Sequence, residues 1–237
     1  MVLANTNYDS KIIVFKKKLD DYEAKQIIEQ KKSNVFKGLF KKPKKDEVHT
    51  HSTKLFYESI LMISGIYTAN FFRKAIHPIN VDYNVTEVML GDGIFPIRSK
   101  SSLQKALSGK KGKNKIDLEL EEHVFINNED TMYFDHHGKE VQFPFKLDSK
   151  NLENYPTRIL KEHESNVKKP EITKEHAIEL LTKKLKKPLE PEVRDLVDEF
   201  TIKEISEIYI PIYEARLIGP KKKVGILRLD AVRNKIL

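Results

Sequence analysis

The tripeptide Asp135-His136-His137 contains the residue types most able to do chemistry in this chain of 237 residues. Carboxylates and imidazoles bind transition metals, and metal-dependent phosphoesterases use such side chains to hold two cations. A metal centre needs about four to six ligands that converge from several segments of the chain. No second motif of separated carboxylates accompanies the tripeptide, so the metal hypothesis depends on these three residues alone.

The residues around the tripeptide favour a turn. Asp135 follows the apolar run Thr131–Phe134, and Gly138 precedes a second alternating run at 139–147. An Asp-x-x-Gly sequence between two such runs is typical of a hairpin connection, in which glycine takes a positive φ. Adjacent histidines in a strand would point to opposite faces and could not chelate one ion. We therefore predict a turn without a stoichiometric transition metal.

The remaining histidines and motifs predict no catalytic residue and no cofactor. His49 and His51 flank a threonine, but two ligands do not make a metal site. The other single histidines lie in polar or turn-like surroundings, where a solvated imidazole is expected. Dinucleotide-binding, Walker, Gly-x-Ser-x-Gly and His-Glu-x-x-His patterns do not occur. An enzyme whose site is assembled from scattered residues remains an alternative.

Lysines provide the strongest binding signal. Aromatic residues alternate with lysines in Phe36–Lys45, and Arg98–Lys115 carries a net charge of +7 without an acidic residue. Lysines neutralise phosphates, while aromatic rings can stack on bases or enter an anionic membrane with Phe36, Leu39 and Phe40 inserted. The alternative is a pair of solvated loops. The candidate polyanion-binding residues are Lys37, Lys41, Lys42, Lys44, Lys45, Lys110, Lys111 and Lys113.

Composition and length set the broad class. The chain has a net charge of +8, is 39% hydrophobic and 33% charged, and lacks cysteine, so no disulfide framework is expected. Its length allows one large domain or two small ones. The longest mostly apolar run, Ser59–Phe72, is shorter than the ~20 residues that span a bilayer. The N-terminus does not resemble a signal peptide. We expect a cytoplasmic protein without a transmembrane segment.

The first half of the chain predicts a strand, a helix and two further strand regions. Lys11–Phe15 is apolar and β-branched, which favours a strand. Asp20 and Glu23 have the spacing of a capping box, and the helix that they begin ends near Lys32. Lys54–Lys74 is ambiguous, but its aromatic and β-branched residues favour a strand. Residues 84–97 alternate around a turn at Gly91–Gly93.

The second half adds three helices and five strands. The helices are expected at Ser102–Leu107, after a Thr173 cap from Lys174 to Leu185, and at Pro191–Phe200. A polar connector covers Asp148–Pro170. The five strand candidates are 115–127, 131–135, 139–147, 205–219 and 222–232.

The last third resembles the PepSY-like modules. The resemblance rests on Ala177-x-x-Leu180-Leu181, on Tyr209-x-Pro211-x-Tyr213-Glu214 and on Asp230-Ala231-Val232, in the order helix, strand, strand. The family has a Thr-Gly pair near its end, where this chain has Arg233-Asn234. Asparagine can take the left-handed conformation that glycine would supply. The resemblance implies a cystatin-like arrangement of one helix on a curved antiparallel sheet, and a binding or regulatory module without catalytic residues.

Together these patterns predict an α+β fold with antiparallel sheets, each packed by one or two helices. The order helix–strand–strand occurs at 20–97 and again at 174–232, which suggests two repeated α-β-β units. The predicted domains are an N-terminal α+β domain at 1–147, a connector at 148–170 and a PepSY-like domain at 171–237. The predicted function is a non-enzymatic binding or scaffold module with a protein partner. The alternatives are a nucleic-acid or anionic-membrane binder that uses the lysine-rich loops, and an enzyme.

Overall fold

The structure, a computed structural model, describes residues 10–37, 43–82, 84–97, 114–187 and 192–237. Strands make up 52% of the described residues and helices 23%. The predicted α+β class is therefore wrong, because the fold is dominated by one large, mostly antiparallel sheet. The strands predicted from the sequence were short, whereas the strands of this sheet continue for many more residues.

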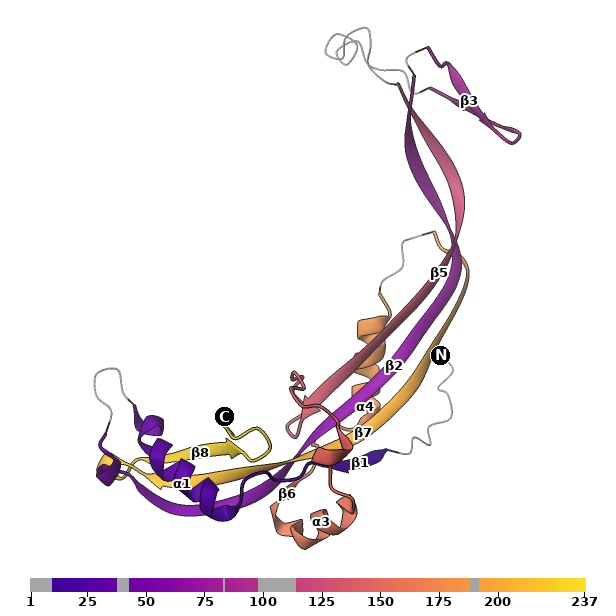
Figure 1. The fold of residues 1–237 in the computed structure, drawn as a ribbon. Helices are drawn as coiled ribbons and strands as arrows, with labels where there is room; N and C mark the ends of the chain where they lie inside the picture. Colours follow the sequence, from indigo (N-terminus) through magenta and orange to yellow (C-terminus); the bar gives the residue numbers. More distant parts are fainter. Residues whose placement is uncertain (1–9, 38–42, 83, 98–113, 188–191) are drawn as a thin grey trace. The chain divides into compact units, whose positions relative to one another are not determined.

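Three long strands make up most of the sheet, namely β2 (His49–Val81), β5 (Asn114–Asp135) and β7 (Arg194–Ile218) (Figure 1). The sheet order is β5-β2-β7-β8-β9, with β8 at Val224–Asp230 and β9 at Lys235–Ile236. Two short strands join it in parallel: β1 (Lys11–Val14) beside β7, and β6 (Val167–Lys168) beside β2. A separate hairpin consists of β3 (Glu87–Leu90) and β4 (Gly93–Pro96). The sequence ranges 1–147 and 171–237 thus both supply strands to one sheet.

The chain divides into two compact units. Unit 1 comprises Met1–Ile66, Glu129–Leu185 and Thr201–Leu237, and unit 2 comprises Tyr67–Asn128 and Lys186–Phe200. All described α-helices belong to unit 1: α1 (Asp21–Lys31), α3 (Pro156–Glu162) and α4 (Lys174–Leu185). The described 3-10 helices are η1 (Lys32–Phe36), η2 (Lys45–Glu47), η3 (Ser149–Asn151), η4 (Glu164–Asn166) and η5 (Pro220–Lys222).

Helix α1 begins at the predicted capping box, but its packing differs from the expected stripe, because Tyr22 is 70% exposed and Ile28 is buried instead. The Asp20 carboxylate accepts a hydrogen bond from the Glu23 backbone N–H at 2.8 Å, and the Glu23 carboxylate accepts one from the Asp20 N–H at 3.1 Å, which completes the capping box. Ala24 and Ile28 are fully buried and pack in one cluster with Leu217, Leu227 and Leu229 of the β7–β8 hairpin. The N-terminal helix thus covers the C-terminal hairpin.

The other two helices each cover part of unit 1. The backbone N–H of His176 donates to the Thr173 hydroxyl at 3.2 Å, so α4 has its predicted cap. The residues Ala177, Leu181 and Leu185 give α4 a buried stripe. Helix α3 lies inside the segment predicted to be a polar connector. Its Ile159 and Leu160 pack against a cluster formed by Val14, Tyr57 and Tyr209.

A segment without regular structure, Val141–Leu147, also covers part of unit 1. The run 139–147 was predicted to be a strand, but the structure describes only an isolated bridge there, between Phe134 and Glu140, and Val141–Leu147 follows it without regular structure. Pro144 has no N–H to donate to a ladder, which explains the failure of the strand prediction. Phe143 and Phe145 instead pack against a core cluster that includes Phe15, Met62, Ile208, Ile210, Ile212 and Val232.

Unit 2 has a small described core. Tyr67, Ala69, Phe71 and Ile116 are buried, whereas Ile76, Phe125 and Val197 are mostly exposed. The helix predicted at Pro191–Phe200 is wrong, because β7 already begins at Arg194. Cross-strand polar contacts accompany this early start, since Arg194 pairs with Glu121 at 2.8 Å. Pairing with long neighbours overrides the local helical spacing of Leu196, Val197 and Phe200.

The two predicted α-β-β repeats do not exist. The C-terminal hairpin is real, because β7 pairs antiparallel with β8 from Ile212↔Asp230 to Ile218↔Val224. In the N-terminal half, β2 pairs with β5 and β7, while residues 87–96 pair only with each other in the described structure. Strand Lys54–Lys74 was correctly predicted as part of β2, but the connectivity differs. The Tyr-x-x-Ile match was too short to establish a repeat.

Candidate functional site

The tripeptide Asp135-His136-His137 forms the predicted turn. The Gly138 N–H donates to the Asp135 carbonyl at 2.9 Å, and Gly138 has a φ of 80°. The Asp135 carboxylate accepts hydrogen bonds from the backbone N–H groups of His137 and Lys139, each at 3.0 Å. The two imidazole ring centroids lie 3.9 Å apart, contrary to the expectation of opposite faces. The alternation rule fails because these residues belong to the turn and not to the strand.

His136 joins a buried ion cluster around Glu58. Glu58 is 6% exposed, and its carboxylate accepts a hydrogen bond from Lys168 at 2.9 Å and another from Arg228. The His136 Nδ1 atom lies 3.8 Å from the same carboxylate. Burial lowers the pKa of His136 below its ordinary value, although Glu58 acts in the opposite direction. The cluster ties β2, β6, β8 and the 135–138 turn together, which is a structural role.

The described residues contain no group of three or more histidine, aspartate or glutamate side chains arranged to hold a metal ion. His49 and His51 are both exposed at the start of β2. In unit 2, His77 pairs with Glu122 at 2.7 Å. None of these three histidines is described as pairing with Glu58.

The lysine-rich segment begins beside a buried contact. Phe36 is half-buried at the end of η1, and its ring fills the space above two glycines. A Cβ atom at Gly219 or Gly225 would lie only 2.8 Å from this ring, so both positions need glycine. The packing removes Phe36 from the role of a base-stacking or membrane-inserting side chain. Leu39 and Phe40 lie outside the described residues.

This contact brings two lysine groups together. Gly219 and Gly225 flank the β7–β8 turn, which contains Lys221, Lys222 and Lys223, and Lys37 directly follows Phe36. Lys44 and Lys45 precede Val48, which is buried in the same cluster as Leu217 of β7. We call this group the lysine end. It comprises the exposed residues Lys37, Lys44, Lys45, Lys221, Lys222 and Lys223.

The lysine end has unbalanced charge. Among the described residues, none of its six ammonium groups forms an ion pair. The nearest carboxylates in the sequence are Asp46 and Glu47, and Glu47 already accepts a hydrogen bond from the Lys44 backbone N–H at 2.7 Å. Lys221 and Lys222 have φ values of 56° and 58°, in the left-handed region that favours glycine or asparagine. The turn is closed by a backbone hydrogen bond between Gly219 and Lys223, and no ion pair among the described residues balances its charge.

Three of the eight predicted lysines therefore belong to a shared surface, while Lys41, Lys42, Lys110, Lys111 and Lys113 lie outside the described residues. Lys221–Lys223 were not predicted as partners of these lysines. The available signal was a run of three lysines between two strands. Their proximity to Lys37 depends on the packing of Phe36 against Gly219, which the sequence does not reveal.

Comparison with family models, with curated proteins and with solved structures finds no match for this chain. The PepSY-like resemblance thus stays a prediction. Asn234 does take the left-handed conformation expected for it, with a φ of 55°. In the described part of the chain, helices long and apolar enough to cross a membrane are absent.

Proposed function

We propose that this protein is a non-enzymatic binding module whose lysine end holds the phosphate backbone of a nucleic acid. The observation that carries the proposal is the meeting of two sequence-distant lysine groups on one end of unit 1. Each lysine that contacts a phosphate releases condensed counterions, and this release supplies sequence-independent affinity. A cytoplasmic location belongs to the same proposal.

Nucleic acid fits the lysine end better than a membrane surface does. Peripheral membrane segments combine basic residues with apolar side chains that enter the lipid. Phe36, the described aromatic residue of the lysine-rich segment, is instead packed over Gly219 and Gly225. The lysines have flexible side chains that end in a positive charge. Such side chains can contact phosphates without base-specific recognition.

Fluorescence anisotropy with a labelled DNA duplex at several salt concentrations tests this proposal. One variant carries Lys221→Asn, Lys222→Asn and Lys223→Gln, because asparagine keeps the left-handed turn. A second carries Lys37→Gln, Lys44→Gln and Lys45→Gln. Each triple variant is expected to reduce the slope of log affinity against log salt by roughly two to three, since each lost phosphate contact removes about 0.9.

The matched control is Lys161→Gln, Lys169→Gln and Lys183→Gln, which removes the same charge from exposed sites elsewhere in unit 1. It should leave most of the slope intact. An equal loss in the control would mean that net charge alone drives binding, and the lysine end would lose its assignment. Binding to anionic vesicles but not to the duplex would refute the nucleic-acid proposal in favour of a membrane.

A further inference from the structure

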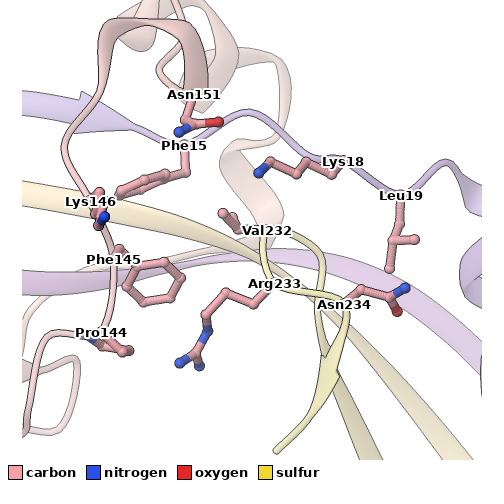
Figure 2. Close-up of a pocket in the computed structure, with 10 residues that line it drawn as sticks. All are labelled: Phe15, Lys18, Leu19, Pro144, Phe145, Lys146, Asn151, Val232, Arg233 and Asn234. Atoms are coloured by element: carbon pink, nitrogen blue, oxygen red, sulfur yellow. The ribbon is translucent and has the colours of Figure 1, made fainter.

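Unit 1 contains a groove that the proposed function does not use. Figure 2 shows Phe145 and Arg233 side by side in it, with Lys18 and Asn151 nearby. Its volume is about 660 Å³, within the range of ~300–1,000 Å³ that is typical of ligand sites. The lining residues are Phe15, Lys18, Leu19, Pro144, Phe145, Lys146, Asn151, Val232, Arg233 and Asn234.

The charged side chains of this lining are all cationic. Lys18 and Lys146 are exposed and form no ion pair with any described residue. Arg233 lies over the Phe145 ring, with 4.6 Å between the guanidinium carbon and the ring centroid. Its Nε donates to the buried Asp230 carboxylate at 2.7 Å, and this hydrogen bond holds the Arg233 side chain in place. The groove thus presents positive charge to a ligand.

The rest of the lining is apolar or amide. Phe15 is 1% exposed and packs against Phe145, with 5.2 Å between the ring centroids. These rings and Val232 form an apolar wall, while the Asn151 and Asn234 amides can donate and accept hydrogen bonds. A ligand for this groove combines several negative charges with apolar groups between them.

One wall also offers backbone hydrogen bonds. Phe145 and Lys146 lie in the Val141–Leu147 segment, beyond the hydrogen bond from Val141 to β5, and among the described residues their backbone N–H groups donate to no acceptor. A ligand backbone needs such donors for its own carbonyl groups, as in peptides that bind beside an extended chain. Nucleic acids do not have this requirement.

We propose that the groove binds an acidic peptide segment in which glutamate or aspartate residues alternate with apolar residues. Lys18, Lys146 and Arg233 face the carboxylates, and the apolar side chains lie against Phe145 and Val232. Inorganic phosphate would fill little of the groove and none of its apolar wall. A stacked base is disfavoured because Arg233 already covers the Phe145 ring. This inference goes beyond the nucleic-acid proposal and uses different residues.

A fluorescein-labelled peptide of alternating glutamate and leucine provides the probe, with a glutamine–leucine peptide as its control. The double variant Lys18→Gln, Lys146→Gln removes two cations that pair with no described residue, so the fold should survive, as circular dichroism can check. We expect saturable 1:1 binding of the acidic peptide, weakened at least about tenfold in the double variant. The control variant Lys161→Gln, Lys169→Gln should bind like the unaltered protein.

Several results would overturn the inference. These are absence of saturable binding, equal affinity for the glutamine peptide, or unchanged affinity in the Lys18→Gln, Lys146→Gln variant. Competition by a DNA oligonucleotide that disappears in the same variant would reassign the groove to nucleic acid. The triple variant Lys221→Asn, Lys222→Asn, Lys223→Gln should keep its peptide affinity, so failure of the groove and failure of the lysine end can be distinguished.

Discussion

Units 1 and 2 share the strands β2, β5 and β7 but bury them very differently. In unit 1, three helices and the Val141–Leu147 segment cover the sheet, and residues such as Ile63, Ile208 and Leu229 are fully buried. In unit 2 the same strands bury only a few described residues, such as Tyr67, Phe71 and Ile116, and Ile76 is 64% exposed. A long strand thus acquires a core only where a second layer covers it.

Polar contacts differ in the same way. The Glu58 carboxylate of unit 1 is 8% exposed and binds two cations. The described pairs of unit 2 are more exposed, for example Arg194 with Glu121, whose side chains are 63% and 45% exposed. Among these pairs, a carboxylate as deeply buried as that of Glu58 is found in unit 1, whereas the carboxylates of the described unit 2 pairs are at least 28% exposed.

Truncation of a buried isoleucine should give the largest contrast between the units. Ile208→Ala in unit 1 is expected to lower the free energy of unfolding by about 2–5 kcal/mol, because it leaves a cavity among Phe15, Met62 and Val232. Ile76→Ala in unit 2 should change it by less than about 0.5 kcal/mol. Urea unfolding followed by circular dichroism measures both. Similar losses in the two variants would show that Ile76 is covered in solution.

Removal of the buried carboxylate should have a smaller effect. Glu58→Gln is expected to destabilise unit 1 by about 1–3 kcal/mol, because Lys168 and Arg228 lose their shared anion. The loss stays below that of a fully buried pair because these cations are 31% and 35% exposed and still reach water. Glu121→Gln in unit 2 is the matched control and should be nearly neutral in the same urea measurement. A neutral Glu58→Gln variant would contradict the contrast.

The pH dependence should be the smallest effect and should belong to unit 1. The pKa of His136 is lowered in the folded protein from its ordinary 6.5, so the unfolded chain binds a proton first as pH falls. His136 thus stabilises the fold above pH 6.5, and this contribution is lost as pH falls toward its folded pKa. The groups that face it are Glu58, Asp135, His137 and Lys168.

Urea unfolding at about pH 7 and about pH 5.5 measures this loss, since the window lies above the range in which most carboxylates titrate. A His136→Gln variant should show a smaller decrease between the two values. Hydrogen exchange at both pH values, corrected for the intrinsic rate, should locate the change in unit 1. A decrease unaffected by His136→Gln would assign the pH dependence to other groups.

Local signals predicted part of the fold. The Asp20–Glu23 capping box, the Thr173 cap and the Gly138 turn each depend on residues within a few positions, and all three were identified correctly. The length of β2 could not be predicted, because Ser59, Leu61, Met62 and Ile63 are all buried and the strand shows no alternation there. Burial of both faces results from layers supplied by distant parts of the chain.

The candidate sites were harder to predict than the fold, because they are formed by residues that lie far apart in the sequence. Single lysines were visible in the sequence, but the meeting of Lys37 with Lys221 requires the packing of η1 on the β7–β8 hairpin. The groove joins Lys18, Lys146 and Arg233 from three segments with no shared motif. Spacing along the chain carries no information about such convergence.

The contact of Phe36 with Gly219 and Gly225 has an evolutionary consequence. Either glycine can mutate only if the ring moves, whereas the intervening residues Pro220–Val224 are mostly exposed and contact the core little. The two glycines thus bracket a short exposed stretch whose charge can change without loss of the fold, provided that positions 221 and 222 keep residues that accept a positive φ. Substitutions confined to the turn Pro220–Val224 would change the charge of the lysine end during evolution. Such a change would also alter which partners the lysine end binds.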